Sequence, residues 1–233
     1  MSESELAYPQ GGPPAHPPGL DHQFESYEQQ RESASLGMWA FIVQEVMFFG
    51  GLFATYMVYR QQYPDAFAAA SHSLDIQLGA FNTAVLIASS LTMALAVRAA
   101  QLGRRRALIG FLAATAILGT VFLGVKVVEY KDKFEHHHVP GPAFHFEETE
   151  RHGVPIDQRH AQMFFGLYFA MTGLHAAHMV IGIAILLWLL YWARKRRFTP
   201  ENYNYVEGTG LYWHFVDIVW IFLFPMLYLI GRH

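Results

Sequence analysis

The sequence predicts an all-α membrane protein, a polytopic bundle of five transmembrane helices. Three observations support this fold class. Of the 233 residues, 53% are hydrophobic and only 15% are charged, which is too apolar for an ordinary soluble domain. Five apolar segments are each long enough to cross a hydrocarbon core of about 30 Å as a helix. Two of the connections between them are short and strongly basic, which is typical of cytoplasmic loops.

The five apolar segments define a transmembrane domain over residues 36–233. The predicted spans are, in order, about 37–59, 78–99, 107–130, 162–191 and 209–230. The second and third spans contain alanines and glycines that let a neighbouring helix approach closely. The fourth is longer than a perpendicular crossing needs, so we expect it to tilt or to project beyond the hydrocarbon core.

Residues 1–35 differ in composition from the rest of the chain. They are rich in proline and glycine and carry six acidic residues against one basic residue, Arg31. Such a segment cannot bury enough apolar surface to fold alone, so we expect a disordered acidic tail, or else a docking peptide for a partner. It has neither the basic start nor the apolar run of a signal peptide.

The basic residues predict the orientation of the chain in the membrane. With the N-terminus inside, nine lysines and arginines fall on the cytoplasmic side and six on the other. The short connections QLGRRR and ARKRRF account for most of this excess. The N-terminus is therefore expected in the cytoplasm and the C-terminus outside.

The composition also excludes some classes of function. A net charge of −3 argues against a nucleic-acid partner, which would require a basic face. The chain has no cysteine, so disulfides, thiolate metal sites and thiol catalysis are excluded.

The first span carries a carboxyl group, Glu45, well inside the apolar run. At 1.5 Å per residue it lies roughly 12 Å into the hydrocarbon core. An ionised carboxylate alone in lipid costs several kcal/mol. We therefore expect Glu45 either to be protonated or to face protein, water or a partner.

The fifth span adds His214 and Asp217, three residues apart. The first and fifth spans run in the same direction, and Glu45 and Asp217 lie at similar distances from their cytoplasmic ends. If these helices pack, Glu45, His214 and Asp217 form a buried polar layer that reduces the cost of burying each group. Such a layer acts either as structural contacts or in proton handling.

Two further pairs of polar residues stand at i, i+3 spacing on one helical face. His175 and His178 in the fourth span favour helix contacts or contacts with lipid headgroups, and ligation of a haem or metal is the alternative. Lys126 and Glu129 in the third span are expected to form an ion pair that snorkels to the interface.

The loop between the third and fourth spans is rich in histidine. Its imidazoles and carboxylates suit copper or zinc. Three adjacent histidines cannot all point at one ion from a regular element, and the nearby Pro-Gly-Pro indicates an irregular surface loop. A solvated loop is the simpler interpretation, and we assign no metal ligands. The histidines are His136, His137, His138, His145, His152 and His160.

Five runs carry a family resemblance, in this order: GMWAFIVQEVMFFGGLF, FNTAVLIASSLTMALA, FLGVKVVEY, FFGLYFAMTGLHAAHMVIG and YWHFVDIVWIFLFPMLYL. Together they resemble subunit III of haem-copper cytochrome c oxidases, in the five-helix form found in bacteria. The match covers all five spans, and MTGLHAAHMVIG followed by YWHFVDIVW is highly specific to that family.

The resemblance implies an accessory subunit of a proton-pumping aerobic terminal oxidase, a multi-pass protein of the bacterial inner membrane. Its expected partners are catalytic subunit I, subunit II and membrane phospholipids, with a respiratory supercomplex as a further assembly. The family's subunit III holds no haem or copper, which belong to partner subunits, so no catalytic centre is expected on this chain. It supports proton uptake by subunit I and the stability of that subunit. Glu45 matches the family's membrane-buried, carbodiimide-reactive glutamate.

One departure from the family concerns the start of the chain. Many members have seven helices, with a lipid-filled cleft between the first two and the other five, and the first two have no counterpart in this sequence. The alternative function, from another class, is a stand-alone membrane carrier of haem or metal that uses His175, His178 and the histidine-rich loop.

Overall fold

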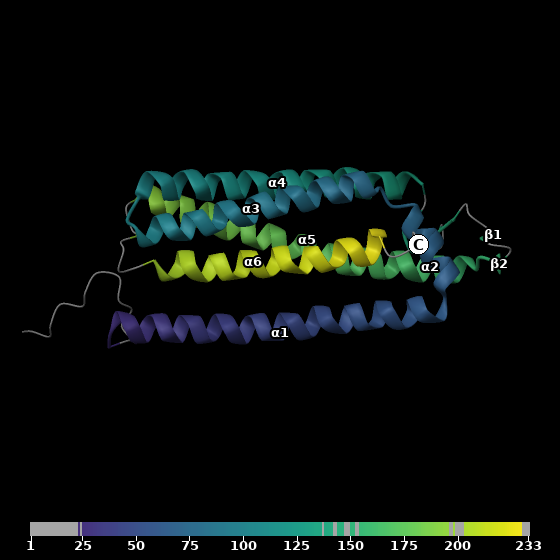
Figure 1. Cartoon of the computed structure of the whole chain (residues 1–233), viewed down its shortest axis with the longest axis horizontal. Coiled ribbons are helices and arrows are strands. Elements are labelled where there is room, and N and C mark those ends of the chain that lie inside the picture. Colours follow the sequence, from purple (N-terminus) through teal and green to yellow (C-terminus); the bar gives the residue numbers. More distant parts are fainter. Residues whose placement is uncertain are drawn as a thin grey trace, which may run out of the picture.

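The structure is a computed structural model that describes residues 23, 25–136, 138–141, 144–146, 150–151, 154–195, 198 and 203–229. Five long helices lie side by side in a bundle (Figure 1). They are α1 (Tyr27–Gln62), α3 (Ile76–Gln101), α4 (Arg105–Glu135), α5 (Gln158–Arg194) and α6 (Asn204–Phe224). Helix α1 begins at one end of the bundle and α6 ends towards the other.

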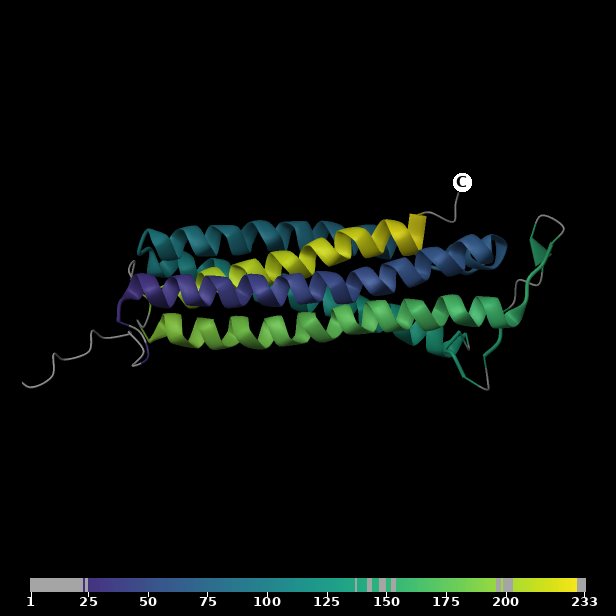
Figure 2. The same ribbon diagram turned by 90° about the horizontal axis from the view of Figure 1, so that it is seen from below.

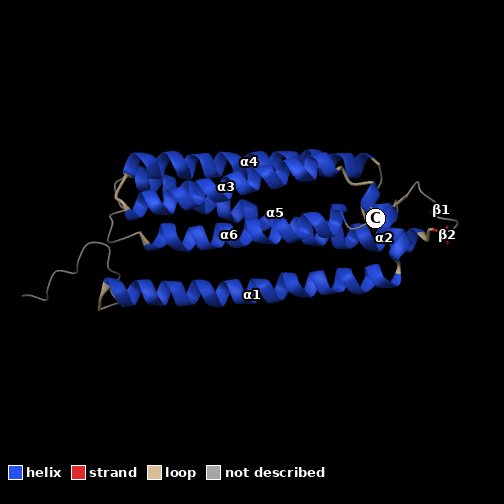
Figure 3. Cartoon of the chain, viewed as in Figure 1, coloured by secondary structure: helices blue, strands red, loops and turns tan. Residues whose placement is uncertain are grey.

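The remaining elements are short. Helix α2 (Pro64–His72) follows α1, a five-residue π-helix η1 (Pro225–Leu229) continues α6, and strands β1 (Glu150–Arg151) and β2 (Val154–Pro155) pair antiparallel. Helix dominates the described part of the chain (Figure 3). The all-α class is therefore confirmed.

The predicted number of spans is confirmed by five helical segments long and apolar enough to cross a membrane; the fifth runs through α6 and η1, and residue 230 of the predicted span lies outside the described residues. The helices extend beyond the predicted spans; α5 has 37 residues and so projects beyond a bilayer core of about 30 Å. Helix α1 begins at Tyr27, so the last residues of the predicted tail, 27–35, are helical. Residues 1–22 and 24 lie outside the described residues.

Local sequence signals fix where several helices begin. The side chains of Ser26, Asp75 and Asp157 each accept a hydrogen bond from a backbone N–H in the first turn of α1, α3 and α5. These caps satisfy donors that have no partner inside the helix. Between α3 and α4 the chain reverses through Gly103, whose φ of 65° suits a residue without a side chain.

Helix α1 lies at the edge of the bundle, against α6 and α5 (Figures 1 and 2). Its outward face is apolar and exposed over most of its length; Leu36, Trp39, Val43, Met47 and Val58 are each more than half exposed. In a bilayer such a face is covered by lipid or by another apolar helix, so its exposure is compatible with a stable fold.

The core centres on Trp213 of α6, which is fully buried where four helices meet. A Cβ added to Gly119 of α4 would lie 2.8 Å from its ring, and one added to Gly182 of α5 would lie 2.9 Å from it. The indole N–H donates to Ser89 of α3 at 3.0 Å. The two glycines therefore make room for the largest side chain in the core.

The π-helix η1 is held by hydrogen bonds from the first part of the chain. Pro225 lacks an N–H, which interrupts the regular helical pattern where α6 ends. The Tyr56 hydroxyl donates to the carbonyl of Met226 at 2.8 Å, and the Ser71 hydroxyl donates to that of Leu227 at 2.7 Å. These side chains satisfy carbonyls that the irregular turn leaves open.

Replacing Gly119 with alanine tests the close contact with Trp213. We expect Gly119→Ala to destabilise the protein by about 1–3 kcal/mol, since the rigid, buried indole cannot move away from the new methyl group. Gly110→Ala, in the same helix but with open space at the Cβ position, should raise stability slightly through helix propensity. Thermal unfolding in mild detergent, followed by circular dichroism, measures both. A melting temperature for Gly119→Ala equal to that of the unsubstituted protein would contradict this packing.

Candidate functional site

Glu45 of α1 pairs with His178 of α5 inside the bundle. The Glu45 Oε2 lies 3.3 Å from the His178 Nε2, and the two side chains are 11% and 16% exposed. The other ring nitrogen of His178, Nδ1, lies 2.9 Å from the carbonyl oxygen of Leu174. Because a carbonyl oxygen can only accept, Nδ1 carries a proton.

This tautomer determines how many protons the pair holds. With Nδ1 protonated, the contact between Nε2 and Oε2 is attractive only when one further proton lies between them. That proton sits on the carboxyl group of Glu45 or on the imidazole of His178, and the pair is neutral overall in either case. A neutral pair removes most of the cost of burying an acid in a membrane.

Aromatic rings cover the pair. Phe49 of α1 lies with its ring centroid 5.6 Å from that of His178. The Tyr212 hydroxyl of α6 donates to the backbone carbonyl of His178 at 2.9 Å. These contacts hold the imidazole in place, and both side chains of the pair keep a small exposed fraction.

His214 and Asp217 lie elsewhere, between α6 and α3. The Nδ1 of His214 is 2.8 Å from the hydroxyl oxygen of Ser90. Neither carboxyl oxygen of Asp217 makes a well-formed hydrogen bond within the described residues, and the residue is only 3% exposed. The expected layer of Glu45, His214 and Asp217 is thus divided, because Glu45 turns towards α5 while Asp217 turns towards α3.

Lys126 and Glu129 of α4 form a fully buried ion pair, 2.9 Å apart, with side chains 3% and 2% exposed. The ammonium group also donates to the Tyr228 hydroxyl at 2.9 Å. Glu129 accepts hydrogen bonds from the hydroxyls of Tyr168 and Tyr228. The Lys126 ammonium lies 4.7 Å from the ring centroid of Trp220, at a cation–π distance.

This network joins α4, α5, α6 and η1, and every member has a partner. The predicted ion pair is present, but the snorkelling expected from the sequence is not what the structure shows, because tyrosine hydroxyls and aromatic rings replace water around the charges. Nothing in the sequence indicated that Tyr168 and Tyr228 contact this ion pair, because both tyrosines are far from it in sequence.

His175 and His178 contact different helices. His175 is 1% exposed and packs between the rings of Phe122 on α4 and Trp220 on α6, with centroid distances of 5.5 Å and 5.3 Å. His178 faces Glu45 on α1 instead. In the part of the chain that the structure describes, no three histidine or acidic side chains gather as metal ligands would.

The histidine-rich loop is only partly described, and His137 and His152 lie outside the described residues. His160 stacks on Tyr63 with ring centroids 3.6 Å apart, and His138 stacks on Phe165 at 4.9 Å. These two imidazoles pack on aromatic rings and lie at the same end of the bundle as α2.

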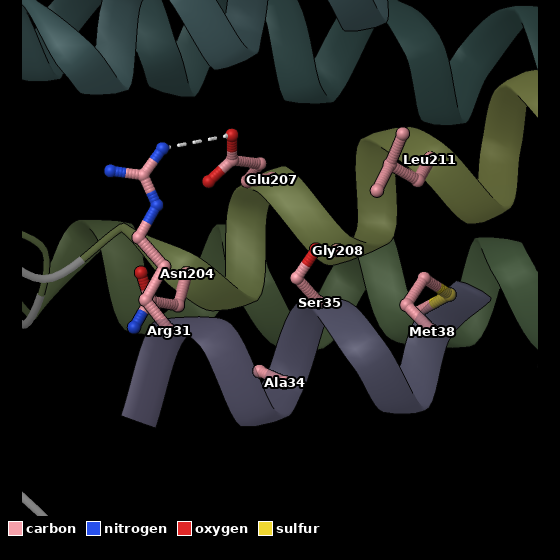
Figure 4. A pocket seen from close by; sticks show the side chains of 8 residues that line it. All are labelled: Arg31, Ala34, Ser35, Met38, Asn204, Glu207, Gly208 and Leu211. Atoms are coloured by element: carbon pink, nitrogen blue, oxygen red, sulfur yellow. Dashed lines mark hydrogen bonds and ion pairs between the residues drawn. The ribbon is translucent and has the colours of Figure 1, made fainter. Parts of the chain in front are cut away.

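At the opposite end, the first turns of α1 and α6 enclose a small pocket of about 120 Å³ (Figure 4). Arg31 reaches across it to Glu207, with a nitrogen–oxygen distance of 3.4 Å. The Arg31 guanidinium also lies 5.4 Å from the ring centroid of Tyr203. Arg31, which was predicted to lie in the disordered tail, therefore joins α1 to α6.

Comparison with known proteins identifies the family. The family model "Cytochrome c oxidase subunit III" matches residues 23–232, which includes every helix described above. The chain belongs to the cytochrome c oxidase subunit III family. The resemblance seen in the sequence motifs is confirmed.

Individual members of the subunit III family are similar over most of their length. Cytochrome c oxidase subunit 3 of Alkalihalophilus pseudofirmus is 30% identical, over 94% of each chain. The protein of the same name from Corynebacterium diphtheriae is 33% identical, over 84% of this chain and 87% of its own. Quinol oxidase subunit 3 of Bacillus subtilis is 29% identical, over 84% and 86%. This is a multi-pass membrane protein of a family whose members are subunits of oxidase complexes.

The buried network of this subunit III chain can be tested by separating its two charges. Lys126→Met should destabilise the protein by about 3–5 kcal/mol, because it leaves Glu129 without a counter-ion in a dry site. The double variant Lys126→Met/Glu129→Gln should recover most of that loss. The control is Lys131→Met, from the exposed pair Lys131–Glu135, which should change little. Thermal unfolding in detergent compares the three, and a double variant no more stable than the single one would refute the pairing.

Proposed function

We propose that this chain is an accessory, cofactor-free subunit of a proton-pumping cytochrome c oxidase, and that it supports proton uptake by catalytic subunit I and the stability of that subunit. The observation that carries the proposal is the Glu45–His178 pair. Besides the proton on Nδ1, the contact between Nε2 and Oε2 calls for one shared proton in a protected site, at the edge of the bundle where α1 meets α5.

The pair has the properties that a proton-handling group requires. Its proton can move between Oε2 of Glu45 and Nε2 of His178 without changing the net charge of the site. Transfer to a neighbouring subunit is favoured by the residual exposure of the pair, since a fully enclosed group cannot exchange protons. The Lys126–Glu129 network lacks these properties, since it is enclosed on all sides by hydroxyls and rings.

Phospholipid binding is the second part of the proposal. A groove of about 410 Å³ runs between α1 and α6 and is lined almost entirely by apolar side chains. Trp39, Ile42, Phe53 and Phe222 are among the residues that form its walls. Its position within the membrane-spanning part of the bundle suits an acyl chain, which would cover a face of α1 left open by the loose packing of this helix.

The proposed function implies a set of partner subunits in the membrane. The direct partner is subunit I and the second is subunit II, the haem and copper belong to these partner subunits, and a respiratory supercomplex is a further assembly. The basic connections after α3 and after α5 support a cytoplasmic N-terminus and an outer C-terminus in a bacterial inner membrane.

Glu45→Gln in the intact oxidase tests the role of the buried pair. Glutamine keeps a hydrogen-bond donor facing His178 but has no proton to release. We expect an unchanged haem spectrum together with slower proton uptake, or a shorter lifetime under turnover. Uptake is measured with a pH-sensitive dye during single turnovers, and the lifetime as the decay of oxygen consumption.

The matched control for Glu45→Gln is Glu135→Gln, which makes the same change at an exposed carboxylate. It should leave uptake and lifetime as they were. Loss of haem from the Glu45→Gln complex would contradict the proposal, as would unaltered uptake combined with an unaltered lifetime.

Purification distinguishes the accessory subunit from a free-standing carrier. In mild detergent we expect the chain to co-purify with oxidase subunits that hold haem and copper. Isolated alone, it should carry neither metal nor haem at a stoichiometric level, as measured by metal analysis and absorption spectroscopy. A stoichiometric haem or copper on the isolated chain would favour the carrier that uses His175 and His178.

A further inference from the structure

A second groove, of about 310 Å³, lies between α3 and α6. Its floor contains Ser90, His214 and Asp217, and its rim is formed by long aliphatic side chains. These rim residues are between 47% and 61% exposed: Ile87, Leu91, Ile218 and Ile221. The groove therefore combines a small polar floor with an apolar rim.

The depth of the polar floor limits what can reach it. Asp217 is the thirteenth residue after Asn204, so it lies roughly 20 Å along a helical segment of about 39 Å. Ser90 stands near the middle of α3 in the same way. Lipid headgroups are therefore more than a helical turn away from both ends of the groove, and acyl chains carry no hydrogen-bond donor.

Asp217 is the least satisfied polar group in this groove, because the hydroxyl beside it, Ser90, is also bonded to His214. It is 3% exposed and neither of its carboxyl oxygens has a well-formed hydrogen bond within the described residues, whereas Ser90 and His214 bond to each other at 2.8 Å. An acid left in this state inside a membrane is costly. Glu129 shows the contrast, because the chain supplies three donors to it.

We propose that the groove between α3 and α6 seats a transmembrane helix of another subunit of the oxidase complex, which supplies a hydroxyl, amide or ammonium donor to Asp217. A groove of this volume accepts side chains rather than a whole helix, so the partner helix lies along the rim with its side chains inserted. Ala94, an exposed small residue that also lines the groove, permits close approach.

Complementarity favours a different subunit over a second copy of this chain. The same face of a second copy would bring acid against acid and aliphatic rim against aliphatic rim. The inference rests on the proposed function, because the partner is a subunit of the oxidase complex. The proposed role of Glu45 does not depend on this face of the chain.

Photo-crosslinking in the purified complex tests the assignment. A photoreactive phenylalanine analogue is placed at Leu91, on the rim of the groove, and for comparison at Ile117 on α4, which is equally exposed. We expect Leu91 to crosslink to a membrane-spanning peptide of another subunit that contains a donor side chain, identified by mass spectrometry, and Ile117 to give no such peptide. Crosslinks from Leu91 to lipid only, or to a second copy of this chain, would overturn the proposal.

Variants of the groove provide an independent measurement. Ala94→Trp fills the groove and should reduce the fraction of chain retained with the catalytic subunits by about tenfold in rising detergent. Ala184→Trp, the same change at an exposed alanine of α5, should leave retention unaltered. Asp217→Leu removes the buried acid while keeping the number of heavy atoms, and should weaken retention while the thermal stability of the isolated chain is kept or raised. Equal retention of Ala94→Trp and Ala184→Trp would also overturn the proposal.

Failure of the proposed function and failure of the groove assignment give different results. If the unsubstituted chain does not co-purify with oxidase subunits, the proposed function fails. If it co-purifies but the crosslinks and the retention losses map to other faces, the assignment of this groove fails and the proposed function stands.

Discussion

Inside a bilayer there is no water to solvate a polar side chain, and this constraint accounts for most of the polar chemistry in the structure. Every ionisable group in a span must find its partner within the chain or on a neighbour. The chain satisfies the constraint to three different degrees. The Lys126–Glu129 network is complete, the Glu45–His178 pair has a charge contact but no hydrogen bond of good geometry at Oε2, and neither carboxyl oxygen of Asp217 has a hydrogen bond of good geometry among the described residues. The fully hydrogen-bonded site stabilises the fold, whereas the sites with fewer hydrogen bonds lie where the chain can contact the rest of the complex.

The strength of each site follows from the number of elements it joins. Glu129 sits on α4, yet its hydrogen bonds fix α5 and η1 as well, so a single carboxylate determines how three elements meet. Glu45 joins only α1 and α5, and α1 is the helix at the edge of the bundle. A proton-bearing pair in a loosely held helix can respond to its surroundings, whereas a four-membered buried network cannot.

Much of the fold could be predicted from the sequence because the length of an apolar run is a direct consequence of bilayer thickness. The five spans and the Lys126–Glu129 pair follow from local spacing alone. The partner of Glu45 could not be predicted, because equal depth in two helices does not determine which way each side chain turns. Depth alone favoured Asp217, but rotation of α1 towards α5 selected His178. Likewise η1 and the part played by Tyr228 depend on contacts with residues far away in sequence, for which no period or motif gives a signal.

The contacts of α1 have a consequence for how the protein is made. Its three polar contacts described above, through Arg31, Glu45 and Tyr56, all lead to α5, α6 or η1, which are the last segments to leave the ribosome. Helix α1 enters the bilayer first, and Glu45 cannot contact His178 until more than a hundred further residues have been synthesised and inserted. The polar contacts of α1 therefore form late, whereas α3 and α4, which share the most extensive contact in the bundle, can pack before α5 and α6 are made.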